Sequence, residues 1–262
     1  MAACSATTVD TSNSNAPQSI VSLDYCADQY VLKMVERENI AALSPDASKA
    51  FSYMRETAKG LPTVRPHAED VLKLNPDIVV RSYGGGPNAQ AFFERAGIEV
   101  VNIGWANDID SIKHITQDIA TKLGNETLGQ SMSADIDARL AGLPQNQSPQ
   151  TSLYMTPSGV TSGSGSLVHE MLISAGLENF HTTPGWQSLP LERLAHEKPD
   201  MIAAAFFDTK SQNKDHWSAM RHPIAQSQLK AVSTVKLDGS WTSCGAWYLL
   251  DAIEALAWGA VK

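Results

Sequence analysis

A glycine-rich segment follows a strand-like apolar run and has the composition of a phosphate-binding loop. Gly84-x-Gly86-x-x-Ala89 fits a loose form of the dinucleotide fingerprint, in which glycines let the backbone approach a pyrophosphate. However, Arg81-Ser82-Tyr83 separates these glycines from the apolar run, and no Gly-Lys-Ser/Thr follows them. We therefore expect a strand-to-helix turn with Arg81 and Tyr83 at the edge of a cleft. A nucleotide-dependent enzyme is the alternative.

Patterns for other catalytic chemistry are incomplete. The segment Gly163–Ser166 does not place a serine between the flanking glycines of a nucleophile elbow. His169-Glu170 lacks the second histidine of a zinc-protease helix, because Ile173 stands at that spacing. We expect no enzyme, no cofactor and no resident metal. A bare metal-ion binder stays open as an alternative, and it would use scattered histidines such as His67, His114, His181 or His222.

Aromatic and basic side chains gather in the predicted loops, most of them where a strand ends. Each ring alone is readily explained by packing, but rings and arginines together suit a flat ligand with anionic or amide edges. The expected ligand contacts are Tyr25, Tyr53, Arg55, Arg65, Arg81, Tyr83, Trp105, Trp186, Phe207 and Trp241.

A short internal sequence repeat, the echo, indicates how the chain positions these loops. Glu69 and Glu192 precede Pro76-Asp77 and Pro199-Asp200 by the same spacing, and an apolar run follows each Pro-Asp pair. Proline ends helices and aspartate suits turns, so each copy predicts a short helix, a stop and a buried strand. Two related α/β lobes are the natural interpretation.

A helical pattern lies between the two copies. Isoleucines recur at helical spacing from Ile109 to Ile119, and about 15 residues at 1.5 Å each would span about 23 Å. We expect an α/β fold, with two Rossmann-like lobes of mostly parallel sheets joined by one long backbone helix. The predicted parts are a disordered tether (1–18), an N-terminal lobe (19–107), the linking helix (108–125) and a C-terminal lobe (126–262).

The amino-acid composition narrows the classes of partner that the protein is expected to bind. The 262 residues carry a net charge of −8 and are 43% hydrophobic, which is ordinary for a globular protein and argues against nucleic acid as a partner. A Ser/Thr/Asn-rich stretch follows Ala-Ala-Cys at the start. The residues Ala2-Ala3-Cys4 are similar to the last residues of a lipoprotein cleavage site. We therefore expect an exported protein in which Cys4 is either lipid-anchored or incidental.

Several ordered segments resemble the helical-backbone (class III) periplasmic binding proteins of ABC importers that carry vitamin B12 and ferric siderophores. They are IVSLDYCADQYVLKM, AEDVLKLNPDIVV, ERAGIEVV, TSGSGSLVHEMLISAGLENF and LERLAHEKPDMIAA. The likeness is closest to the vitamin B12-binding branch. It implies a monomer in the periplasm with a cleft between its lobes and little domain closure. The ligand would be a metal chelate, a corrinoid or else a ferric siderophore or haem, delivered to an inner-membrane ABC permease.

The resemblance also assigns roles to single residues. Glu69 and Glu192 fall where the family carries glutamates that dock on permease arginines, although exposed acids at a helix start are the plainer explanation. Trp186 matches a pocket aromatic. Two loops depart from the family pattern and place Cys26 and Cys244 at the predicted cleft. These cysteines could pair, contact the ligand or do neither.

Overall fold

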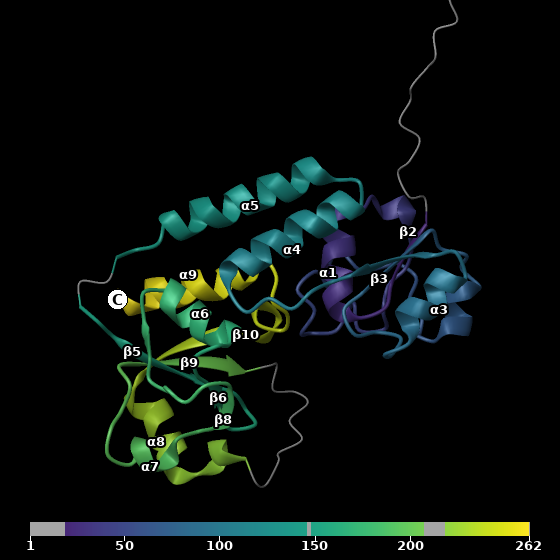
Figure 1. Ribbon diagram of the computed structural model, residues 1–262. Helices are drawn as coiled ribbons and strands as arrows, with labels where there is room; N and C mark the ends of the chain where they lie inside the picture. Colours follow the sequence, from purple (N-terminus) through teal and green to yellow (C-terminus); the bar gives the residue numbers. More distant parts are fainter. Residues whose placement is uncertain (1–18, 146–147, 207–217, 262) are drawn as a thin grey trace, which may run out of the picture.

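The chain forms two α/β lobes in a computed structural model that describes residues 19–145, 148–206 and 218–261 (Figure 1). The predicted tether, Cys4 and Phe207 lie outside the described residues. None of the helices within these ranges is long and apolar enough to cross a membrane.

The N-terminal lobe is built on a sheet of four parallel strands in the order β2-β1-β3-β4. Its elements are β1 (Ile20–Ser22), α1 (Tyr25–Met34), η1 (Arg37–Asn39), β2 (Ile40–Ala42), α2 (Ala68–Leu72), β3 (Ile78–Arg81), α3 (Ala89–Arg95) and β4 (Glu99–Asn102). Both faces of the sheet are covered. Ile78 and Val80 pack with α1 on one face, and Val79 packs with Val71 and Phe93 of α2 and α3 on the other. Such two-sided burial explains the continuous apolar run of β3.

The C-terminal lobe has a second four-stranded parallel sheet, in the order β10-β9-β5-β7. Its elements are β5 (Thr151–Met155), β6 (Val160–Ser162), α6 (Leu167–Ser174), β7 (Glu178–Asn179), β8 (Trp186–Ser188), α7 (Leu191–Leu194), β9 (Met201–Phe206), η3 (Ala219–Arg221), α8 (Pro223–Ala231), β10 (Ser233–Asp238), η4 (Gly239–Trp241) and α9 (Leu249–Ala260). Strands β6 and β8 form a separate antiparallel pair.

The two lobes share one topology, which confirms the interpretation of the echo. Across the sheet, the order β7-β5-β9-β10 repeats the order β2-β1-β3-β4 of the first lobe. The Pro-Asp stops are also alike. The backbone N–H of Asp77 donates to the carbonyl of Ser19 at 2.8 Å, and that of Asp200 donates to Thr151 at 3.0 Å. Each short helix therefore delivers the chain to the strand beside the first strand of its lobe.

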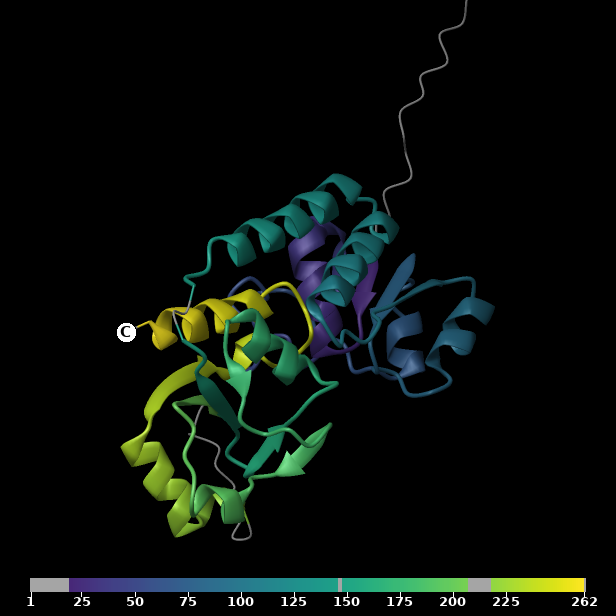
Figure 2. The same cartoon turned by 60° about the vertical axis from the view of Figure 1, so that its left-hand side comes forward.

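Two helices join the lobes. The predicted linking helix is present as α4 (Ile109–Lys122), and α5 (Glu126–Ala141) runs back alongside it (Figure 1). Ile112 and Ile136 pack in the core of the C-terminal lobe, whereas Ile119 and Met132 pack in that of the N-terminal lobe. Each helix thus contributes side chains to both cores. In both views the pair lies at the end of the molecule opposite α7 and α8 (Figure 2).

Candidate functional site

The lobes meet where α1 begins and where the chain approaches α9. The Tyr25 hydroxyl donates to the Ser243 carbonyl at 3.1 Å, and the next residue, Cys26, forms a disulfide with Cys244 across a Cα–Cα distance of 5.9 Å. Of the three alternatives open for the cysteines, the structure thus shows pairing. Neither cysteine offers a free thiol to a ligand.

The glycine loop, residues 82–88 after β3, is held by the carboxylate of Asp24. Asp24 Oδ2 accepts hydrogen bonds from three successive backbone N–H groups, those of Ser82, Tyr83 and Gly84, at 2.7, 3.0 and 2.9 Å. Three converging amides are the kind of nest that binds an anion, and here the anion is internal. A Cβ on Gly84 would lie 2.4 Å from the Leu23 carbonyl oxygen, so close backbone packing requires this glycine. The loop has the form of a strand-to-helix turn, as expected, and does not hold its amides free for a phosphate.

The three predicted arginines make contacts within the protein. Arg81 is only 8% exposed and donates from Nε to the Gly84 carbonyl at 2.7 Å and from Nη2 to the Gly86 carbonyl at 3.0 Å. The Arg81 side chain therefore stabilises the loop from within the protein, whereas the sequence predicts it at the edge of a cleft. Arg65 pairs with Asp70 at 3.1 Å, and Arg55 donates to the Ser52 carbonyl at 3.1 Å.

Three of the predicted aromatic side chains are exposed and come from different parts of the fold. Tyr83 in the glycine loop is 51% exposed, Trp105 in the segment before α4 is 85% exposed, and Trp186 on β8 is 59% exposed.

Two aromatic residues that the sequence analysis did not name support this set. Tyr25 packs edge-on against Phe51 and Tyr83, with ring centroids 5.0 and 6.0 Å apart. Trp186 lies 6.2 Å from the buried ring of Tyr154. Phe51 stands two residues before Tyr53 in the same loop, so its type and place were a usable signal. Tyr154 reads only as a strand residue.

Two further predicted residues pack within the protein. Tyr53 stacks on Tyr248 at 4.3 Å and donates to Asp251 Oδ2 at 2.8 Å, which makes it a third tie between the lobes. Trp241 is half-buried against the core of the C-terminal lobe.

The electrostatic environment of the exposed rings is acidic. Burial raises the pKa of the Tyr25 and Tyr83 phenols, and nearby carboxylates including Asp24 and Asp46 add to the rise. Both phenols are protonated at neutral pH, but Tyr25 donates its hydrogen bond to the Ser243 carbonyl, so Tyr83 is the phenol that could donate to a ligand. Beneath them, burial raises the pKa of Asp28 to about 6, although this carboxylate accepts from the Ser44 N–H and hydroxyl at 2.9 and 2.6 Å. Tyr25, Phe51 and Tyr83 thus form an aromatic cluster beside the glycine loop, with carboxylates nearby.

Residues 20–237 match the family described as periplasmic binding protein. This match spans most of the chain. The chain belongs to the periplasmic binding protein family. Members of this family bind small solutes and work with ABC permeases. Among curated protein sequences, none matches this binding protein.

Solved structures of periplasmic binding proteins share the fold. The heme-binding protein RhuT from Roseiflexus sp. RS-1 is 19% identical, with a TM-score of 0.72 over 93% of this chain and 97% of that one. The heme-binding protein HutB of Vibrio cholerae is 19% identical, with a TM-score of 0.71 over 93% and 98%. The vitamin B12-binding protein BtuF of Vibrio cholerae is 17% identical, with a TM-score of 0.65 over 94% and 97%. At these identities the likeness is one of fold.

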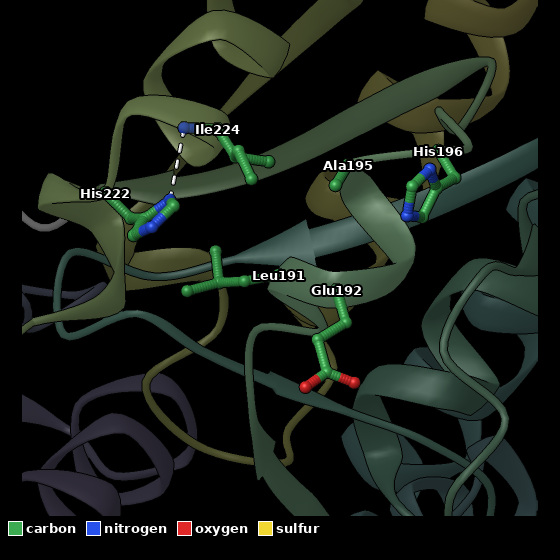
Figure 3. Close-up of a pocket in the computed structure, with 6 residues that line it drawn as sticks. All are labelled: Leu191, Glu192, Ala195, His196, His222 and Ile224. Atoms are coloured by element: carbon green, nitrogen blue, oxygen red, sulfur yellow. Dashed lines mark hydrogen bonds between the residues drawn. The ribbon is translucent and has the colours of Figure 1, made fainter.

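The two glutamates of the echo are exposed at the surface of this binding protein. Glu69 lies on α2 and Glu192 on α7, and no ion pair found among the described residues involves either of them. Glu192 stands at the edge of an open hollow of about 540 Å³ between α7 and α8 (Figure 3). Within the described ranges, no three His, Cys, Asp or Glu side chains are grouped to hold a metal ion.

Proposed function

We propose that this periplasmic binding protein captures a corrinoid, a flat metal macrocycle of the vitamin B12 type, and delivers it to the permease of an ABC importer. The observation that carries the proposal is the set of exposed rings, Tyr83, Trp105 and Trp186. They come from the N-terminal lobe, the connection and the C-terminal lobe, and most of a flat ligand's affinity would come from covering such rings.

Charge favours a corrinoid over more anionic chelates. Arg81 and Arg55 donate to backbone carbonyls and Arg65 pairs with Asp70, while burial and then nearby carboxylates raise the pKa of Tyr25 and Tyr83. An amide edge can accept a hydrogen bond from the neutral Tyr83 phenol, whereas carboxylate edges are bound most strongly by Arg or Lys cations. The similar fold of BtuF, which is described as binding vitamin B12, agrees with this choice.

Haem is the second candidate, because RhuT and HutB have the same fold and are described as heme-binding. A ferric siderophore is the third. An enzyme that uses a nucleotide finds less support, since Asp24 occupies the loop amides that a phosphate would need.

The cellular location and the transport partner that we propose are those of the periplasmic binding protein family. The Cys26–Cys244 disulfide suits an oxidising compartment such as the periplasm, and Cys4 is our candidate for a lipid anchor. Glu69 and Glu192, one in each lobe, would meet cationic side chains of the inner-membrane permease. The binding protein would act as a monomer.

Titrating tryptophan fluorescence of the purified protein separates these ligands. Cyanocobalamin, haemin and a ferric hydroxamate would be added in turn, with inner-filter controls. We expect saturable quenching by cyanocobalamin at low micromolar concentration or below. Saturation by haemin or the hydroxamate alone would reassign the ligand, and saturation by ATP or NAD would restore the enzyme alternative.

A further inference from the structure

The hollow between α7 and α8 has apolar walls and a charged rim. Leu191, Ala195 and Ile224 line it, with His196 and His222 at its sides, and the Glu192 carboxylate points away at its edge (Figure 3). The Nδ1 atom of His222 accepts the Ile224 N–H at 3.2 Å, which leaves Nε2 as the donor of the neutral ring. Its volume is in the range of small binding pockets, roughly 300–1,000 Å³.

The equivalent place in the N-terminal lobe carries a larger side chain. Leu72 and Ala195 are the same residue of the repeat, since each lies three positions after its glutamate and four before its proline. Leu72 has 37% of its surface exposed, and Ala195 lines the hollow with a much smaller side chain. Each exposed glutamate therefore has an apolar side chain three positions after it, a leucine in one lobe and an alanine beside the hollow in the other.

We propose that the hollow is a socket for one apolar side chain of the ABC permease, next to the permease cation that pairs with Glu192. The inference rests on the proposed function and adds to it the chemistry of the partner. Charge complementarity identifies the cation, because Glu192 is exposed and makes no ion pair among the described residues. The apolar walls identify its neighbour as an aliphatic or aromatic residue. Because a leucine stands in one lobe where an alanine stands in the other, the two docking surfaces would differ, and the binding protein would have one preferred orientation.

Filling the socket tests the inference. Wild-type protein, Ala195→Trp and Glu192→Lys would be compared for binding to the cognate permease in lipid nanodiscs by biolayer interferometry. Ala134→Trp is the matched control, since it places the same side chain on the exposed face of α5, at the opposite end of the molecule. Far-UV circular dichroism and urea unfolding would verify that each variant folds, and Ala195→Leu serves as a milder filling variant.

We expect both Ala195→Trp and Glu192→Lys to weaken permease binding at least about 10-fold, a change of about 1.4 kcal/mol, with Ala134→Trp unchanged. If Glu192→Lys alone weakens binding, the socket is refuted and glutamate docking stands. If neither variant matters, docking through this lobe falls as well. Ligand titration in solution is independent of both results, so the ligand assignment is judged separately.

Discussion

At the scale of single residues, the exposed tryptophans are the side chains that a ligand would change most. Trp105→Ala and Trp186→Ala should each raise the Kd for cyanocobalamin roughly 3- to 10-fold, because an aromatic contact contributes about 0.5–1.5 kcal/mol beyond its buried area. Trp258→Ala on α9 is the control, since Trp258 is also exposed, at 53%. Isothermal titration calorimetry measures all three. Equal affinities in the four proteins would remove these rings from the site.

Asp28 makes folding depend on pH. Burial raises the pKa of its carboxyl from 3.8 to about 6, so the folded protein holds this proton more tightly than the unfolded chain does. The stability that this provides is complete below pH 4 and is lost as the pH rises through 6, by roughly 2–3 kcal/mol. Urea unfolding between pH 4 and 7 should show this decrease in wild-type protein and a smaller one in Asp28→Asn. Parallel pH profiles would contradict the assignment.

Single residues also mark the limit of what the sequence predicts. The aromatic types in the loops identified Tyr83, Trp105 and Trp186, whose exposure the structure shows. The internal bonds of Arg81 were not predictable, because they depend on how the loop folds back on its own carbonyls. The same holds for Asp24, whose partners lie 58 to 60 positions away in the sequence.

At the scale of elements, the disulfide ties the start of α1 to the segment before α9. It closes a loop with a sequence separation of 218, and removing such a crosslink commonly costs about 2–5 kcal/mol, because the unfolded chain regains freedom. The double variant Cys26→Ser/Cys244→Ser should therefore unfold at lower urea concentration. Wild-type protein treated with a phosphine reductant should match it. An unchanged midpoint in both would show that the bond contributes no stability.

Elements that are marked by a local sequence signal were predictable. Elements that are defined by contacts far apart in the sequence were not. The Pro-Asp stops identified α2, β3, α7 and β9, because proline and aspartate act on their own neighbourhood. The pairing of β6 with β8 joins Thr161 to Gln187, and no periodicity in a three-residue strand indicates it. The bridging role of α5 was also missed, since its apolar spacing does not say which lobe each side chain meets.

At the scale of the whole molecule, the lobes are joined too firmly for a wide hinge motion. Helices α4 and α5 enter both cores, and the disulfide, the Tyr25–Ser243 bond and the Tyr53–Asp251 bond connect the lobes again. Small-angle X-ray scattering should therefore give the same radius of gyration with and without saturating cyanocobalamin. A smaller radius in the loaded oxidised protein would reveal a closure that these ties do not prevent.

The bond between Cys26 and Cys244 also constrains how the protein is made. An exported chain crosses the membrane from its N-terminus, so Cys26 reaches the oxidising side 218 residues before its partner. During that interval the first lobe can begin to fold while the Cys26 thiol has no partner. Correct oxidation must wait until the second lobe has been translocated almost completely. The disulfide can therefore form only in a chain that carries both lobes.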